Sequence, residues 1–184
     1  MSAPMIHSEE TNKKESVLEI ARKMMIAART APKGKGRDTL EMLVVDGKHI
    51  KQLSDKLHQM AEETDTGFYH RDGDNILQAE AVFLIGTRIE TLGLNEICQL
   101  CGFRNCKLKE LKAPNTPCVF NTGDLNLAIG SAVGLAATYH VDNRVMFSVG
   151  KAAQELGLFN DSVKIVFGIP LSASSKNPFF DRTP

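Results

Sequence analysis

The chain has few aromatic residues and no excess of charge of either sign. Tryptophan is absent, aromatic residues make up 6% of the 184 residues, and 22 basic residues balance 22 acidic ones. Proteins that bind nucleic acids neutralise phosphates with a basic excess, so this balance argues against a nucleic-acid partner. The hydrophobic content of 42% and the charged content of 24% are those of an ordinary folded domain.

Long hydrophobic runs are also missing. The longest spans residues 125–141 and is interrupted by Asn126 and His140, whereas a helix needs about 20 apolar residues to cross a bilayer. The N-terminal segment lacks a basic stretch followed by an apolar core, so we expect no secretory signal and no membrane partner. We therefore expect a cytoplasmic protein, in a reducing compartment where cysteines serve metals or redox chemistry more often than disulfides.

Hydrophobic periodicity predicts an alternation of helices and strands. Ser16 opens a capping box at the expected start of the first helix, and Pro32 limits its end. Two later helices have expected N-caps: Asp124 for the first, and Asp142 or Asn143 for the second. The expected elements are helix 16–31, strand 40–45, helix 50–61, strand 81–86, helix 124–139, helix 144–156 and strand 163–169, with a polar connection at 64–75.

This order predicts an α+β (α/β) fold with a small central sheet covered by helices. We expect a flexible segment at residues 1–14 and a single domain at residues 15–184, with a cysteine-rich insert at residues 93–118. In helix 124–139 the small residues Ala128, Ser131 and Gly134 predict a close crossing with another helix. Such packing about a two-fold axis would suit a homodimer.

All four cysteines of the chain fall within a window of 21 residues, as Cys98-x2-Cys101-x4-Cys106-x11-Cys118. Two thiolates two residues apart can chelate one metal from a tight turn, and Gly102 permits the positive φ that such a turn needs. Four thiolates also complete the coordination of an iron–sulfur cluster. Structural zinc, or four buried thiols without metal, are the alternatives, because the spacing alone does not separate them.

Residues 29–37, RTAPKGKGR, form a second unusual segment directly after the first helix. Its glycines free backbone amides, and Arg29, Lys33, Lys35 and Arg37 supply positive charge, so the loop could hold a phosphate. The alternative is a solvated basic turn. The segment follows a helix and not a strand, which separates it from nucleotide-binding loops of the Walker and dinucleotide types.

The sequence shows no Ser/His/Asp set and no paired carboxylates, so it does not indicate a hydrolase. The five histidines are scattered and lack the spacing of metal ligands. The polar tail at residues 172–182 carries the adjacent Phe179 and Phe180, which we expect to dock, on the same chain or on a second subunit. The sequence names no catalytic residue.

The stretch LNEICQLCGFRNC resembles the Cys-x2-Cys-Gly-x3-Cys element of bacterial four-iron, four-sulfur domains of electron-transfer proteins. From residue 15 to residue 182 the chain also resembles an uncharacterised bacterial and archaeal family that contains a ferredoxin-like domain. The matching segments are MMIAARTAPKGKG, AVFLIG, CQLCGFRNC, DLNLAIGSAVGLA, VDNRVMFSVGKAAQELGL and GIPLSASSKNPFFDR. This resemblance implies a 4Fe-4S cluster with Cys98, Cys101, Cys106 and Cys118 as ligands.

A helix ending in AAR-x-AP, a glycine-containing loop, an apolar strand and an amphipathic helix resemble the opening of flavin-dependent nitroreductases. The later helices and the GIP strand are also similar to that fold. The resemblance implies a nitroreductase-like homodimer with FMN at its interface, and it makes Arg29, Lys33, Lys35, Lys176 and Arg182 candidates for gripping the phosphate. The Arg-Arg-Ser element usual at the start of those enzymes is absent, and Lys33 replaces the serine expected after Ala-Pro.

Together these patterns favour a redox or electron-transfer protein that carries a cysteine-ligated iron–sulfur cluster on a nitroreductase-like scaffold and works with a redox partner protein. Two other functions fit the sequence: a binding or regulatory module with structural zinc, and an FMN-dependent reductase. If the protein is an enzyme, it is expected to be an oxidoreductase. No substrate follows from the residues.

Overall fold

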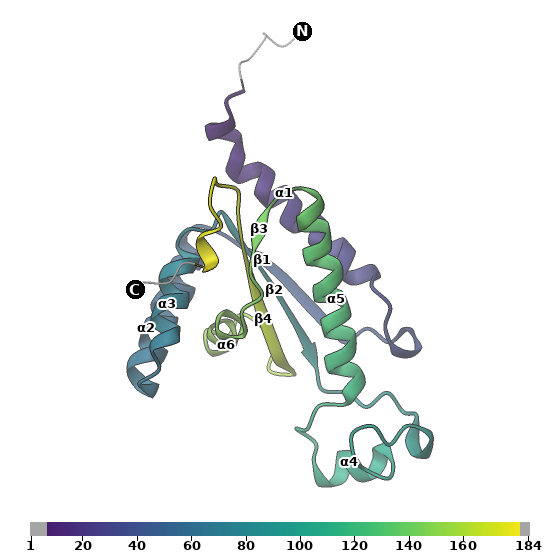
Figure 1. The fold of residues 1–184 in the computed structure, drawn as a ribbon. Helices are drawn as coiled ribbons and strands as arrows, with labels where there is room; N and C mark the ends of the chain where they lie inside the picture. The colour runs from purple at the N-terminus through teal and green to yellow at the C-terminus, as the bar shows by residue number, and fades with distance from the viewer. Residues whose placement is uncertain (1–6, 181–184) are drawn as a thin grey trace.

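The computed structural model describes residues 7–180. Their strands are β1 (Leu40–Val45), β2 (Ala81–Arg88), β3 (Asp142–Asn143) and β4 (Val163–Ser172). They form one antiparallel sheet in the order β1-β2-β4-β3 (Figure 1). The first seven residues of β2 are buried, because helices cover both faces of the sheet and the apolar run AVFLIG has no polar face to expose.

One face of the sheet is covered by α1 (Glu9–Thr30) and α5 (Val119–Thr138), which lie side by side (Figure 1). Alanines fill the layer between these helices and the strands, among them the fully buried Ala28 and Ala128. The Ser131 hydroxyl donates to the Ala27 carbonyl at 2.8 Å. The close helix crossing predicted from the small residues of α5 is therefore confirmed, and its partner is α1.

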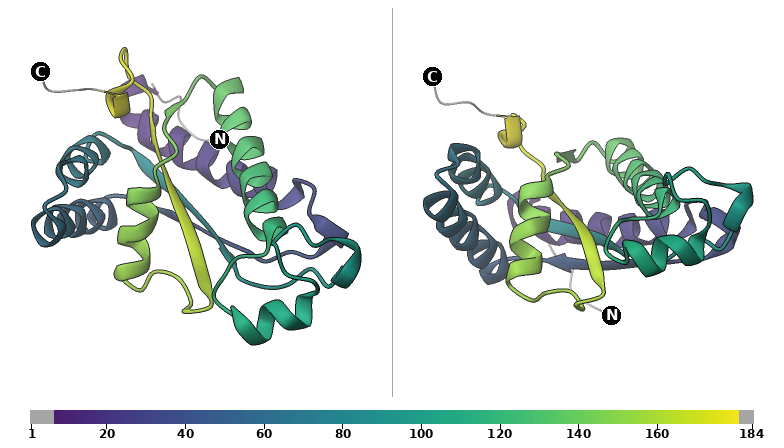
Figure 2. Two further views of the ribbon diagram at one scale, coloured as in Figure 1. Left: turned by 60° about the horizontal axis from the view of Figure 1, so that its bottom comes forward. Right: turned by 90° about the horizontal axis from the view of Figure 1, so that it is seen from below.

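The opposite face carries α2 (Lys48–Thr64), α3 (Gly67–Ile76) and α6 (Phe147–Glu155) (Figure 2). Val82 and Leu84 of β2 pack on this side, whereas Phe83 and Ile85 pack under α1 and α5. The alternation follows from the two-residue period of a strand. Short 3₁₀ turns complete the chain: η1 (Gly34–Gly36), η2 (Asn95–Ile97) and η3 (Pro178–Phe180).

The predicted start of the first helix at Ser16 is wrong. The helix begins at Glu9, and Ser8 caps it by accepting a hydrogen bond from the Thr11 N–H at 3.3 Å. Ser16 lies inside the helix, where its sequence pattern resembles a cap without acting as one. Of the segment expected to be flexible, residues 9–14 are therefore helical, and residues 1–6 lie outside the described part of the chain.

Two other boundaries differ from the prediction because side chains find distant partners. Asp124 does not cap a helix: α5 begins five residues earlier, with Cys118 at its N-cap, and the Asp124 carboxylate accepts from the Gly34 N–H at 3.0 Å. The polar connection expected at residues 64–75 is largely α3. Its buried Asp72 accepts a hydrogen bond from the Ser148 hydroxyl at 2.6 Å, so polar residues can face inward there.

The third helix boundary shifts for a simpler reason. Asp142 and Asn143 pair with β4 as strand β3 and do not cap the following helix, which starts at Phe147.

Across the described residues, no helix combines the length and the apolar character needed to cross a membrane.

Candidate metal centre

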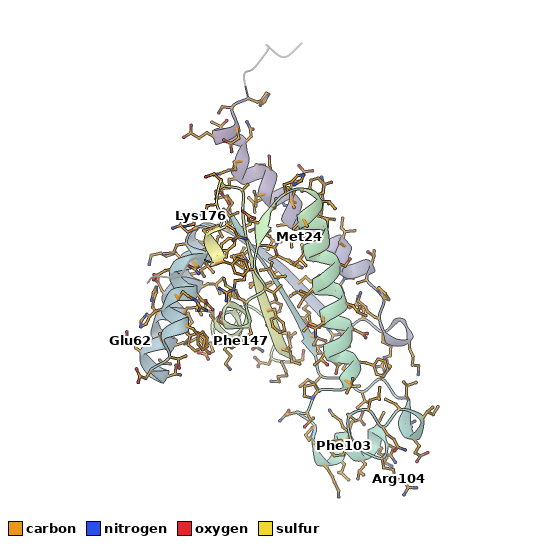
Figure 3. All side chains as sticks on the ribbon, viewed as in Figure 1. Met24, Glu62, Phe103, Arg104, Phe147 and Lys176 are labelled. Atoms are coloured by element: carbon orange, nitrogen blue, oxygen red, sulfur yellow. The ribbon has the colours of Figure 1, made fainter. Side chains whose placement is uncertain are left out.

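Residues 93–118, called the cysteine lobe below, leave the sheet after β2 and return at the start of α5. In Figure 1 this segment projects beyond the end of the sheet, and Figure 3 places Phe103 and Arg104 at that end of the molecule. Its regular structure consists of η2 and α4 (Cys106–Lys112). Asn105 caps α4 by accepting from the Leu108 N–H at 2.9 Å, which fixes Cys106 as the first helical residue.

The first half of the lobe is a series of tight turns. Gly93, Asn95, Gln99 and Gly102 all have positive φ angles, of 77°, 50°, 50° and 82°. The Gly102 N–H donates to the Gln99 carbonyl at 3.0 Å, closing a turn that contains Cys101 and directly follows Cys98. The positive φ predicted for Gly102 is confirmed, and it places the two cysteines on one compact loop.

All four cysteines line the same small cavity, of about 20 Å³. Cys118 is buried, the other three are half-buried, and none of the four takes part in a disulfide. Three elements supply them: the turn after η2 gives Cys98 and Cys101, α4 gives Cys106, and the N-cap of α5 gives Cys118. The remaining walls are mostly apolar and include Leu92, Leu94, Phe103, Val119 and Phe120.

Polar groups around the cavity suit negatively charged sulfur. The Asn95 N–H points at the Cys106 Sγ, at 3.4 Å, and hydrogen bonds of this kind stabilise thiolates and tune iron–sulfur clusters. Cys118 sits at the N-terminus of the 20-residue helix α5, where the helix dipole favours negative charge. The buried side chain of Lys109 also lines the cavity.

In this structure the residues around the cavity do not form a ready-made site for a single metal ion. A zinc site needs its thiolates about 2.3 Å from a common centre. Among residues 7–180, no three His, Cys, Asp or Glu side chains are grouped closely enough to hold one ion in this way. In a four-iron cluster each cysteine binds its own iron, so the ligands surround the group without meeting at a point. Because the cavity has room for little more than one water, the turns of the lobe must move apart to admit a cluster.

The Gly/Lys loop at residues 29–37 lies against the wall of the cysteine cavity, at residues that flank the lobe. A Cβ atom added to Gly34 would lie 2.9 Å from Leu92 and 3.1 Å from Phe120, both of which line the cysteine cavity. The Arg37 guanidinium donates to the Thr91 carbonyl at 3.1 Å. The structure thus places the Gly/Lys loop beside the cavity that the four cysteines line.

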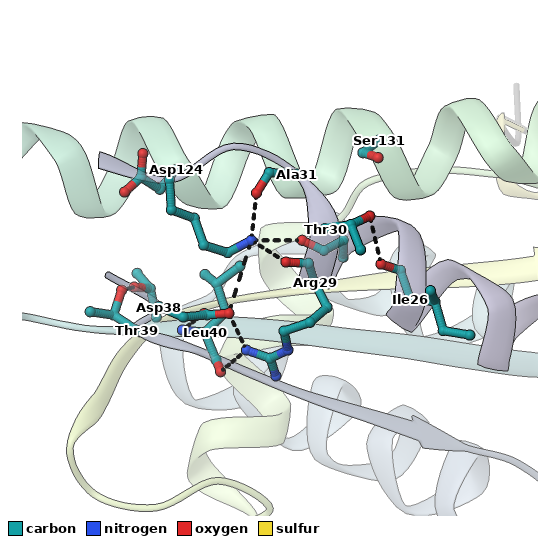
Figure 4. Close-up of polar contacts among 12 residues, drawn as sticks. Ile26, Arg29, Thr30, Ala31, Asp38, Thr39, Leu40, Asp124 and Ser131 are labelled. Carbon is teal, nitrogen blue, oxygen red and sulfur yellow. Dashed lines mark hydrogen bonds and ion pairs between the residues drawn. The ribbon is translucent and has the colours of Figure 1, made fainter. Parts of the chain in front are cut away.

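Two of the basic residues expected to hold a phosphate make internal contacts. Arg29 pairs with Asp38 at 2.6 Å and donates to the Leu40 carbonyl at 3.1 Å (Figure 4). The Lys33 ammonium is buried at the end of α1, where it donates to the carbonyls of Ala28, Arg29 and Ala31 at 2.6–3.1 Å. Lys33 thereby satisfies carbonyls at the C-terminus of α1, beyond the C-cap Ala31.

Asp38 is the carboxylate that serves both cations. Burial raises the pKa of the Asp38 carboxyl, but hydrogen bonds from Arg29 and from the Leu40 N–H, together with the charges of Arg29 and Lys33, outweigh it and hold that pKa below its ordinary value. The carboxylate therefore stays charged at neutral pH and joins the end of α1 to the start of β1.

The remaining phosphate candidates are spread over the molecule. Lys35 lies in η1 with a φ of 53° and is exposed. Lys176 lies near α3, at the opposite end of the molecule from the lobe (Figure 3). Arg182 falls outside the described residues. Next to Lys176, η3 seats the fully buried Phe179, while Phe180 stays exposed. Binding of one phosphate by these residues together stays a prediction.

Asn95 and Lys109 are site residues that the sequence reasoning missed. Lys109 lies three positions after Cys106, so both occupy one face of α4, and that spacing was a usable signal. Asn95 acts through its backbone N–H, which no side-chain pattern reveals.

Comparison with known proteins shows which family and which fold this chain resembles. The family described as "Uncharacterized protein containing a ferredoxin domain" (DUF2148) matches residues 114–182, which include Cys118. A protein of Archaeoglobus fulgidus, described as "Uncharacterized protein", is 40% identical over 98% of this chain and 99% of its own.

Solved structures resemble the chain in fold. A nitroreductase with bound FMN from Desulfitobacterium hafniense matches with a TM-score of 0.58 at 15% identity, over 95% of this chain and 82% of its own. A BluB-like flavoprotein from Clostridium difficile matches with a TM-score of 0.55 at 16% identity, over 99% of this chain and 88% of its own. The nitroreductase-like fold and the family predicted from the sequence are confirmed: this chain belongs to the family of uncharacterized proteins that contain a ferredoxin domain, built on a nitroreductase fold.

Proposed function

We propose that the protein is a redox protein whose cysteine lobe carries an iron–sulfur cluster, of the 4Fe-4S type, held by Cys98, Cys101, Cys106 and Cys118. The observation that carries the proposal is that one cavity is lined by every cysteine of the chain. Four free thiols on three elements are retained without a disulfide, which suits the reducing cytoplasm. The ferredoxin domain in the family description supports the same cofactor.

When bound, such a cluster takes up and releases one electron at a time. The surrounding residues would have distinct roles: the four cysteines would bind the irons, the Asn95 N–H would stabilise negative charge on Cys106 Sγ, and Leu92 and Phe120 would keep water from one side. The lobe projects from the body, so a partner can approach its half-buried cysteines from solvent (Figure 1).

The outer surface of the lobe suits contact with a redox partner protein. Ile97 is 89% exposed, Leu111 79% and Leu100 64%, and exposed apolar side chains are a feature of interaction surfaces. Leu100 lies between Cys98 and Cys101, so a partner seated there would come close to two of the four cysteines.

Metal analysis of anaerobically purified protein tests the proposal. We expect about four irons and four inorganic sulfides per chain, with a broad visible absorption that dithionite bleaches. The Cys106→Ser variant should lose most of the iron, whereas Leu100→Ala, in the same loop, should keep it. Colourless wild-type protein that takes up no iron on reconstitution, or that contains one zinc per chain, would contradict the proposal.

FMN binding is a second candidate function, because the fold is shared with a nitroreductase described as having bound FMN and the Gly/Lys loop packs against Leu92 and Phe120 in the wall of the cysteine cavity. We propose FMN at a homodimer interface, next to that loop. Quenching of FMN fluorescence on adding excess protein, together with a dimeric mass in solution, would support it. Monomeric protein that leaves the fluorescence unchanged would exclude it without affecting the cluster proposal.

A further inference from the structure

Lys109 is buried in a place where a lysine is unexpected. Residues 93–117 are all described by the structure, and Lys109 is the only buried residue among them, with 2% of its surface exposed. It lies in α4, one helical turn after Cys106, and lines the same cavity as the four cysteines. Lys107 and Lys112 of the same helix are exposed. Burial is therefore a property of this position and not of lysines in this helix.

The contacts of the Lys109 ammonium leave its charge uncompensated by protein. The ammonium donates to the Pro114 carbonyl at 3.1 Å, which uses one of its three N–H donors. Within the described residues, no carboxylate lies within ion-pair distance of Lys109. A buried ammonium without a counter-charge is strongly destabilising, and the cavity beside it is lined by four sulfurs that become anionic on binding metal.

We propose that Lys109 is the counter-charge of the cysteine centre and that it raises the reduction potential of the bound cluster. The inference rests on the proposed function. Uptake of one electron from a one-electron donor adds one negative charge to the cluster, with no bond broken and no proton taken up. A positive charge on a buried side chain that lines the cavity favours the more negative, reduced form, because burial leaves little solvent to screen the attraction.

A redox titration of loaded protein, followed by EPR of the reduced cluster, tests the inference. In Lys109→Gln the amide can still donate to the Pro114 carbonyl, but the charge is gone. We expect the equilibrium to shift at least tenfold toward the oxidised cluster, which corresponds to a midpoint potential lower by about 59 mV. Lys109→Arg keeps the charge and should stay close to wild type. The matched control Lys112→Gln removes an exposed charge from the same helix and should shift the equilibrium less than about twofold.

The outcomes separate this inference from the function on which it rests. Wild-type protein that takes up no cluster defeats the proposed function itself. A loaded Lys109→Gln variant with an unchanged potential overturns the role of Lys109 and leaves the cluster in place. If Lys109→Gln does not load, Lys109→Met and Lys109→Arg decide: loading by the arginine variant alone supports the need for charge, whereas failure of all three variants assigns Lys109 a packing role and overturns the inference.

Discussion

In the body of the protein, seven successive residues of β2 are buried between two layers of helices, whereas across the 25 residues at positions 93–117 the one buried side chain is a lysine. The body therefore has the hydrophobic core that ordinarily drives folding. The lobe has short helices, tight turns and exposed aliphatic residues around four thiols. A segment built in this way needs another source of order, and metal binding is the usual one in small cysteine-rich units.

The largest contrast between the two regions should be in the free energy of unfolding. Phe83→Ala removes a fully buried ring from the centre of the sheet and should cost about 3–5 kcal/mol. Leu111→Ala removes a side chain that is 79% exposed on the lobe and should change stability by less than about 0.5 kcal/mol. Urea unfolding followed by circular dichroism measures both. Equal losses would mean that the lobe shares the core of the body.

Loading the cluster should change the lobe and leave the body as it is. We expect amide hydrogen exchange in residues 93–118 to slow by about tenfold or more when iron and sulfide are supplied, because a bound ligand stabilises the folded, ligand-bound form of the segment against local unfolding. Exchange in β2 and β4 should stay the same. Mass spectrometry resolves the two regions, and Cys101→Ser, treated identically, supplies the control. Protection spread evenly over the sheet would contradict the distinction between the regions.

The contact between the Gly/Lys loop and the wall of the cysteine cavity can be tested at Gly34. In Gly34→Ala the new methyl group would meet Leu92 at 2.9 Å, which should cost about 1 kcal/mol and loosen the wall of the cysteine cavity. Gly123→Ala is the matched control: it lies in α5, where an added Cβ meets nothing within 4 Å, and it should stabilise the helix by up to about 1 kcal/mol. Thermal unfolding measures the stability of both variants. A Gly34→Ala variant as stable as wild type would show that the Gly/Lys loop lies near Leu92 without packing tightly against it.

The smallest expected effect is the pH dependence that Asp38 gives to the body. Its pKa is lowered in the folded protein, so its contribution to stability is present above the ordinary carboxyl pKa of about 3.9 and is lost as the pH falls through the lowered value. Asp38→Asn should therefore flatten the acid limb of the stability profile below about pH 4. Asp161→Asn gives the background for loss of an exposed carboxylate. If the stability of wild type and Asp38→Asn falls in the same way at acid pH, the Arg29–Asp38 pair does not contribute to this pH dependence.

The sequence predicted best what depends on local pattern. Strand 40–45 matches β1 at both ends, and the run AVFLIG forms a strand buried on both faces. Boundaries set by distant partners were missed: Asp124 resembled a cap but binds the Gly34 N–H, 90 positions away. Spacing identified the cysteines, but it could not show that Cys118 reaches the same cavity, because the start of α5 places it there.

The phosphate candidates illustrate the opposite case. Positive charge in residues 29–37 was visible in the sequence, yet in the structure Lys33 donates to carbonyls at the end of α1 and Arg29 pairs with Asp38. A local charge pattern does not distinguish a cation that awaits a ligand from one already engaged by the backbone. Lys109 shows the same limit, since its burial follows from the packing of α4 and not from its neighbours in the sequence.

The most direct test of a cluster-bearing lobe is the Mössbauer spectrum of wild-type protein reconstituted anaerobically with ⁵⁷Fe and sulfide. We predict that most of the iron gives the signal of a four-iron, four-sulfur cluster and that a variant with all four cysteines changed to serine gives none of it. Iron bound only as isolated ions, or the same spectrum from the serine variant, would contradict the assignment of the four cysteines to an iron–sulfur centre.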